Sequence, residues 1–207
     1  SSRTIYGGTY AFMKNYLPKF QIKTSFVDTT KIDQIESAIT KKTKMIFCET
    51  MSNPLLEVSD IYAISRLAKK HNILLVVDNT FTPMIFSPAR MGADVVIHSL
   101  TKFINGTSDT VGGVICSNEE FISDLIDVNS GSAMLLGPVM DSMRSASILK
   151  NTRTLHLRMK KHSENAMYLA SSFQKDGLKV MYPGLNSHPQ HKMMTKNMNE
   201  GFGFGGI

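Results

Sequence analysis

Residues 73–102, ILLVVDNTFTPMIFSPARMGADVVIHSLTK, contain two apolar runs, and each run leads directly into chemically reactive residues. The first run is followed by Asp78, and the second ends shortly before Lys102. Between them, residues 86–93 have the length of a short helix. Fully apolar strands separated by helices are typical of a parallel sheet that is covered on both faces. The stretch therefore predicts an α/β fold.

The same alternation continues on both sides of this stretch. Apolar or half-apolar runs predict further strands, and apolar residues at helical spacing predict helices. The strands are expected at residues 23–28, 44–50 and 112–117, and the helices at residues 31–40 and 59–71. The second of these helices begins with the capping pair Ser59 and Asp60. Together these elements predict a mostly parallel sheet flanked by helices.

A different pattern follows Gly137 and Pro138. Residues 140–177 have long helical patterning, and Gly177 is a natural helix stop. Residues 178–183, LKVMYP, then have the character of a strand that opens a second unit.

This change in pattern predicts two parts of the chain. We expect a large domain over residues 1–145, and connecting helices with the beginning of a C-terminal α/β domain over residues 146–207. The chain starts at SSRTIY without an initiator Met and ends in the glycine-rich stretch 201–207, so we expect a fragment of a longer protein.

Composition narrows the classes of partner. The net charge is +6, but Lys and Arg are scattered singly and lack interleaved aromatic residues, so no nucleic-acid partner is predicted. No run of about 18 apolar residues is present, so no membrane partner is predicted. The two cysteines, Cys48 and Cys116, form no disulfide framework or metal motif, and His188 and His191 lack acidic or Cys partners nearby in sequence. These features predict a soluble, cytoplasmic protein without a metal site.

In an open parallel sheet, ligands gather at the carboxyl ends of the strands. Asp78 and the group Ser99, Thr101 and Lys102 follow two such ends and are expected at the same edge. In extended chain the hydroxyls of Ser99 and Thr101 would point one way and Lys102 the other. This set of an amine, a carboxylate and an anion-binding pair of hydroxyls would suit a phosphorylated pyridine aldehyde. The lysine would form an imine with the aldehyde, the carboxylate would contact the ring nitrogen, and the hydroxyls would bind the phosphate.

Simpler interpretations remain open for these residues. Asp78, followed by Asn79 and Thr80, has the character of a turn residue. Lys102 has the sequence context of an ordinary exposed lysine. His98, between the two reactive positions, is expected to pack in the core.

The segment VVDNTFTPMIFSPARMGADVVIHSLTKFINGTSDTVGG, residues 76–113, resembles the cofactor segment of the cystathionine synthase and lyase family of pyridoxal phosphate enzymes. The resemblance continues to YGGTY at residues 6–10, to ETMSNPLLEV at residues 49–58, and to TRTLHLRMKKHSENA at residues 152–166. It covers nearly the whole chain in order. It implies the large domain of a fold type I pyridoxal phosphate-dependent transferase.

The resemblance implies a role for each matching residue. Lys102 would form the Schiff base with the cofactor and move protons, and Asp78 would pair with the pyridine nitrogen. Ser99 and Thr101 would bind the phosphate. Tyr6 would stack on the ring and act as an acid or base, and Asn53 would lie near the phenolic oxygen of the cofactor. Glu49, in the same motif as Asn53, is expected to be structural.

The resemblance also implies an activity, which is cleavage of the C–S bond at the gamma carbon of methionine or cystathionine. The alternatives are gamma replacement, as in cystathionine gamma-synthase or O-acetylhomoserine sulfhydrylase, and an inactive cofactor-binding fragment. Gly8 stands where well-known methionine gamma-lyases have a cysteine, which argues against a strict methionine gamma-lyase. The context of residues 6–20 and the stretch at residues 186–192 favour a lyase over a replacement enzyme. The expected partners are a small sulfur amino acid and further copies of the chain in a homotetramer.

Overall fold

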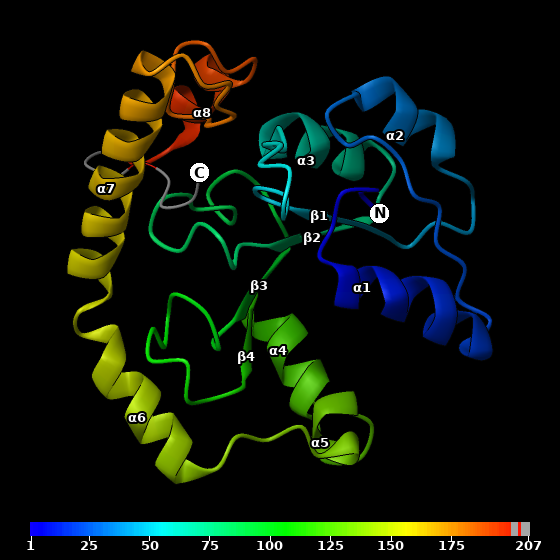
Figure 1. The fold of residues 1–207 in the computed structure, drawn as a ribbon. Helices are drawn as coiled ribbons and strands as arrows, with labels where there is room; N and C mark the ends of the chain where they lie inside the picture. The colour runs from blue at the N-terminus through cyan, green and yellow to red at the C-terminus, as the bar shows by residue number, and fades with distance from the viewer. Residues whose placement is uncertain (200–202, 204–207) are drawn as a thin grey trace.

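A four-stranded sheet forms the centre of the computed structural model, which describes residues 1–199 and residue 203 (Figure 1). Its strands lie in the order β1 (Met45–Glu49), β2 (Leu74–Asp78), β3 (Val95–Ser99) and β4 (Gly113–Cys116). The first three strands are parallel, and β4 is antiparallel to β3. The predicted mostly parallel α/β fold is confirmed.

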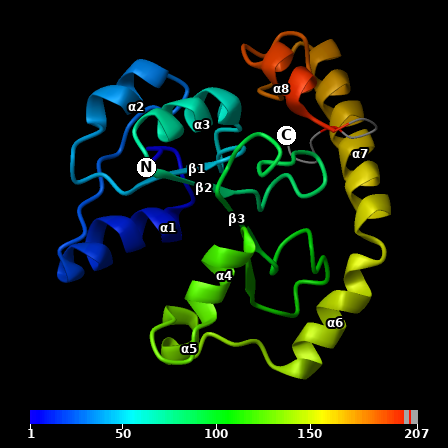
Figure 2. The same ribbon diagram turned by 180° about the vertical axis from the view of Figure 1, so that it is seen from behind.

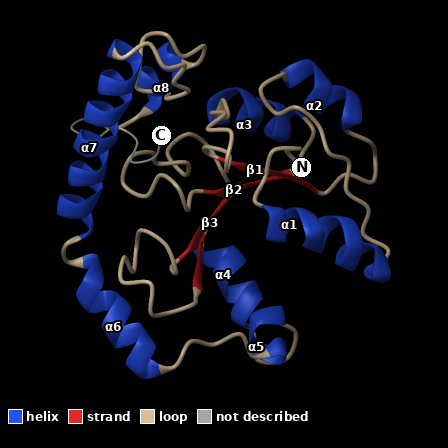
Figure 3. Cartoon of the chain, viewed as in Figure 1, coloured by secondary structure: helices blue, strands red, loops and turns tan. Residues whose placement is uncertain are grey.

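Helices surround this sheet (Figure 3). Helix α1 (Gly7–Ala11) continues as a π-helical turn over Phe12–Tyr16 and a 3-10 turn over Leu17–Phe20. The other helices are α2 (Ile32–Ala38), α3 (Ile61–Lys70), α4 (Glu119–Ile126), α5 (Ser132–Leu136), α6 (Ser142–Thr152), α7 (Leu155–Lys175) and α8 (His191–Asn197). Both ribbon views place α2 and α3 on one side of the sheet and α1 and α4 on the other, with α6 and α7 along the end farthest from α2 (Figures 1 and 2).

Both faces of the sheet are buried because the side chains of its apolar strands alternate between them. One face contributes to a core cluster that also contains residues of α3 and α7, and the other contributes to a smaller cluster with Ile5 and Met13. The first face carries Ile46, Cys48, Leu75 and Val77, and the second carries Phe47, Val76 and Val95.

The predicted helix start at residue 60 is confirmed. Asp60 caps α3 by accepting a hydrogen bond from the backbone N–H of Ala63. Ile61, Ile64 and Leu67 are buried, so the apolar stripe of α3 faces the sheet as its spacing indicates.

Two predicted elements are wrong. Residues 86–93 form a single turn rather than a helix, because Gly92 takes φ 97° and its carbonyl accepts a hydrogen bond from the Ser65 hydroxyl. Residues 23–28 form no strand. The N-terminal residues occupy the free edge of β1 through a hydrogen bond from Ser2 N to Phe47 O, and Val27 makes only an isolated bridge to Ser2.

The C-terminal part also differs from the prediction. The long helical pattern is divided into α6 and α7 at Arg153 and Thr154. Residue 145 lies within α6, and the boundary between the two expected domains stays a prediction. Gly177 adopts φ 82° just beyond α7, which confirms the helix stop. Residues 178–183 do not form a strand, because no described segment pairs with them. The glycine-rich stretch 201–207 lies outside the described residues except for Gly203. Within residues 1–199 and 203, no helix combines the length and apolar character needed to cross a membrane.

Candidate active site

A small cavity lies at the edge of the sheet where the three parallel strands end. Glu49, Asp78 and Ser99 are the last residues of β1, β2 and β3, and Glu49 and Asp78 are partners in the strand register. Five of the six predicted site residues line this cavity, and the sixth, Thr101, does not. The full lining is Tyr6, Glu49, Met51, Asn53, Asp78, Thr80, Phe81, Ser99 and Lys102.

Asp78 both stabilises a turn and faces the cavity. Its carboxylate accepts a hydrogen bond from the N–H of Thr80 at 2.9 Å, so Asp78 has the turn contact that the simpler interpretation predicts. The Thr80 hydroxyl in turn accepts a hydrogen bond from the N–H of Ser99 at 2.7 Å. This short chain of contacts fixes the ends of β2 and β3 relative to each other. The Asp78 carboxylate and the Ser99 hydroxyl therefore line one cavity.

The chain does not stay extended after Ser99, so the predicted alternation of side chains is wrong. The Lys102 N–H donates to the Ser99 carbonyl at 3.4 Å, and the Gly106 N–H donates to the Lys102 carbonyl at 2.8 Å. This turn brings Lys102 to the same cavity as Ser99. The Thr101 hydroxyl instead accepts a hydrogen bond from the N–H of Gly112 at 3.1 Å.

The Lys102 amine makes no hydrogen bond or ion pair with any part of the chain that the structure describes. Its side chain is exposed although it borders the cavity. An amine that is not engaged in an ion pair is available to a ligand, in contrast to the salt-bridged Lys70 on the surface.

Glu49 connects the two remaining predicted residues. One carboxylate oxygen accepts a hydrogen bond from the N–H of Tyr6 at 2.8 Å, and the other accepts one from the N–H of Asn53 at 3.1 Å. Glu49 is only 7% exposed, whereas Tyr6 is 53% exposed. Burial, together with the charge of Asp78, raises the pKa of the Glu49 carboxyl to about 7, although the two N–H groups oppose this rise.

The sequence carries the same signal at Glu49 as at Asp78. MIFCE at residues 45–49 is an apolar run that ends in a carboxylate, as LLVVD at residues 74–78 does. The rule that drew attention to Asp78 applies equally to Glu49.

None of the histidines lines the cavity. His98 is half-buried, its Nδ1 has no hydrogen-bond partner among the described residues, and burial lowers its pKa. His188 accepts a hydrogen bond from the N–H of Gln190, and His191 contacts the Pro183 carbonyl. In residues 1–199 and 203, no group of three His, Cys, Asp or Glu residues could hold a metal ion.

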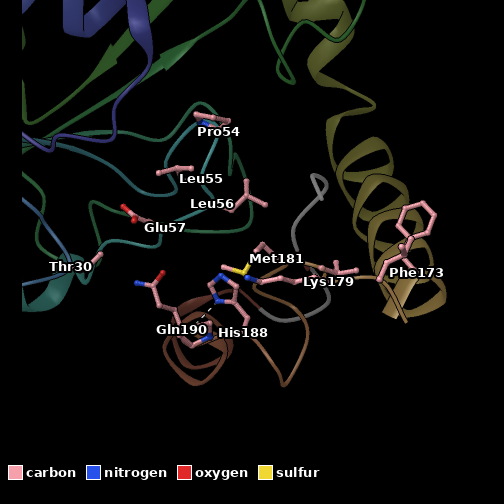
Figure 4. Close-up of a pocket in the computed structure, with 13 residues that line it drawn as sticks. Thr30, Pro54, Leu55, Leu56, Glu57, Phe173, Lys179, Met181, His188 and Gln190 are labelled. Carbon is pink, nitrogen blue, oxygen red and sulfur yellow. Dashed lines mark hydrogen bonds between the residues drawn. The ribbon is translucent and has the colours of Figure 1, made fainter. Parts of the chain in front are cut away.

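A larger groove of about 880 Å³ lies between residues 54–57 and residues 173–190 (Figure 4). Its lining is mostly apolar and contains none of the predicted site residues. Glu57 and Lys179 line it from two separate segments, and His188 and Gln190 line it from a third (Figure 4). The reactive side chains are thus gathered in the smaller cavity at the strand ends.

Comparisons with known proteins show the family of the chain. The model of the Cys/Met metabolism PLP-dependent enzyme family matches residues 1–205. A methionine gamma-lyase of Arabidopsis thaliana is 42% identical over all of this chain and 47% of its own length. A cystathionine beta-lyase of Lactococcus lactis subsp. cremoris is 41% identical over 98% of this chain and 53% of its own length.

A solved structure shows the same fold. The cystathionine gamma-lyase of Lactobacillus plantarum, complexed with L-serine, superposes with a TM-score of 0.90 at 33% identity, covering 98% of this chain and 53% of that one. The chain therefore spans about half the length of the relatives it matches. With the fold and these likenesses in agreement, the chain belongs to the Cys/Met metabolism family of pyridoxal phosphate-dependent enzymes.

Proposed function

We propose that the protein containing this chain cleaves the C–S bond at the gamma carbon of a sulfur amino acid, as a methionine or cystathionine gamma-lyase does. The observation that carries the proposal is that one cavity is lined by residues carrying an amine, two carboxyls, two hydroxyls, an amide and a phenol. The names of the relatives, which include methionine gamma-lyases and cystathionine gamma-lyases, support the same chemistry.

The chemistry of the donor set fits pyridoxal phosphate. Lys102 would hold the aldehyde carbon, Asp78 the ring nitrogen, Tyr6 the face of the ring and Asn53 its phenolic oxygen. Ser99 would bind the phosphate, whereas Thr101 lies outside the cavity with its hydroxyl at the Gly112 N–H, so the predicted role of Thr101 would require that hydroxyl to turn toward the cavity. When bound, the cofactor supplies an electron sink for charge that develops on the substrate.

The chain's own residues supply the remaining functions. The Asp78 carboxylate favours a proton on a nearby basic nitrogen, because an anion raises the pKa of such a group. The Lys102 amine would take a proton from the substrate and return it, and its position at the cavity without an ion-pair partner among the described residues supports this role. The Tyr6 phenol is a second acid or base at the same cavity.

Gamma replacement is the alternative, and a relative named cystathionine gamma-synthase from Mycobacterium leprae is 37% identical. The test uses the full-length protein with pyridoxal phosphate, first alone and then with methionine, cystathionine or O-acetylhomoserine. We expect visible absorbance from lysine-linked cofactor, its loss in Lys102→Ala, and release of a 2-oxo acid without added thiol. Product that forms only when a thiol is added would select replacement. Absence of bound cofactor in both proteins would leave only an inactive scaffold.

We also propose a homotetramer in the cytoplasm, with the large domain ending near residue 145. Leu136, Val139 and Met143 are each at least 80% exposed, and burying these apolar side chains against another copy of the chain would stabilise the assembly. Light scattering on the full-length protein tests the oligomer, and a monomer would contradict it.

The cysteines support the proposed compartment. Cys48 and Cys116 are both unpaired, which suits a reducing compartment.

A further inference from the structure

Glu49 occupies an unusual position for an ionisable side chain. It ends the edge strand of the parallel part of the sheet, it is 7% exposed, and it lines the cavity beside its register partner Asp78. Burying a carboxyl costs free energy unless its oxygens are well satisfied by hydrogen bonds. The contacts of both oxygens therefore indicate what the residue does.

Both oxygens accept hydrogen bonds from backbone N–H groups of predicted site residues. Tyr6 N lies at 2.8 Å from Oε1, and Asn53 N lies at 3.1 Å from Oε2. Tyr6 directly precedes α1 and has no side-chain cap there, and Asn53 belongs to the loop after β1. One side chain thus joins two separate segments to the sheet edge.

We propose that Glu49 is a positioning residue that holds Tyr6 and Asn53 at the cavity through its two carboxylate oxygens. This proposal rests on the proposed function, because it assigns the positioning of an acid or base and of a cofactor-binding amide. Glu49 acts through the backbone of these residues, so removing it changes their orientation without removing their side chains.

The ionised form of Glu49 accepts both hydrogen bonds most strongly. A carboxylate offers acceptors at both oxygens, whereas a protonated carboxyl has one oxygen that donates. Burial and Asp78 raise the pKa of Glu49 to about 7, and the N–H groups of Tyr6 and Asn53 oppose that rise. The other titratable groups at the cavity are the Tyr6 phenol and the Lys102 amine, and Cys48 is the neighbouring residue on β1. The two segments are therefore held most firmly above about pH 7.

Glu49→Gln tests this proposal because glutamine keeps the shape and loses one acceptor. The matched control is Glu57→Gln, since Glu57 accepts a hydrogen bond from the Thr4 hydroxyl at 2.9 Å and lines the other groove (Figure 4). Both variants lose one charge, and both alter a contact with the N-terminal segment.

The first measurement is amide hydrogen exchange in the full-length protein without cofactor, at pH 8. We expect the Tyr6 or Asn53 amide to exchange at least about tenfold faster in Glu49→Gln, and neither to change in Glu57→Gln. Equal exchange in wild type and Glu49→Gln would overturn the proposal.

The second measurement is the pH profile of kcat with cofactor bound. The ratio of wild-type to Glu49→Gln activity should rise about tenfold as pH passes through 7, because the wild-type carboxyl ionises there. A ratio that is constant with pH, or an equal loss in Glu57→Gln, would contradict the positioning role. Failure of wild type to bind cofactor would overturn the proposed function but leave the exchange result valid.

Discussion

Arg158 of α7 donates hydrogen bonds to the carbonyl oxygens of Phe103 and Ile104, the two residues that follow Lys102. The same guanidinium also donates to the Asn151 carbonyl at 3.1 Å and to the Thr154 hydroxyl at 3.1 Å. A planar group with five N–H donors suits such convergent acceptors. Helix α7, more than 50 residues along the chain, therefore holds the turn that carries the predicted catalytic lysine.

Arg158→Ala should lower the free energy of unfolding by about 2–3 kcal/mol, because it leaves partly buried carbonyls without donors. It should also lower kcat, since the Lys102 turn loses its support. Urea unfolding and steady-state kinetics measure the two effects. Arg153→Ala is the control, because Arg153 is exposed between α6 and α7. Equal effects in both variants would show that the carbonyl contacts do not matter.

Gly106→Ala should destabilise the protein through the same contact. Gly106 has φ 76°, and an added Cβ would lie 2.3 Å from Nη1 of Arg158. Gly137 has a similar φ of 71° but nothing within 4 Å of an added Cβ, so Gly137→Ala measures the backbone cost alone. We expect about 1–2 kcal/mol for Gly137→Ala, because a Cβ at positive φ is strained. Gly106→Ala should cost at least about 1 kcal/mol more, because overpacking adds to the backbone cost. Similar losses in thermal unfolding would mean that Arg158 moves aside freely.

Gly8→Ala should change the active site more than it changes stability. An added Cβ at Gly8 would lie 2.7 Å from Cε1 of Tyr6, so the ring must shift, whereas Gly7 has nothing within 4 Å. Both substitutions replace glycine in α1 and should stabilise the helix by up to about 1 kcal/mol. Only Gly8→Ala should alter KM or substrate preference in assays with methionine and cystathionine. An equal kinetic change in Gly7→Ala would point to the helix rather than to the ring.

Glu49 should make the fold less stable as pH rises from 4.5 to 7. Its pKa is raised in the folded protein from 4.5 to about 7, so the folded state binds the proton more tightly and loses that advantage as the carboxyl ionises. The difference corresponds to about 3 kcal/mol at pH 8. Wild-type stability relative to Glu49→Gln should fall by that order between pH 4.5 and 8 in chemical unfolding. A difference that is independent of pH would show that Glu49 has an ordinary pKa.

Sequence patterns predicted correctly those elements that are determined by neighbouring residues. The apolar runs at residues 73–77 and 95–97 became central strands, and the Asp60 cap and the Gly177 stop lie where the sequence indicates. The wrong elements depended on distant partners. Residues 23–28 are separated from β1 by the N-terminal residues, and residues 178–183 have no described strand beside them.

The sequence by itself determined the α/β class, the edge of the sheet where Asp78 and Ser99 meet, and the family resemblance, because alternating apolar strands and helices allow few arrangements. Only the tertiary structure decided how the chain turns after Ser99, which brings Lys102 into the cavity and directs Thr101 to Gly112. Tertiary structure also decided that Glu49 joins Tyr6 to Asn53 and that Arg158 supports the lysine turn. These contacts join residues that are distant in sequence, or depend on how a loop folds back, and periodicity carries no information about either.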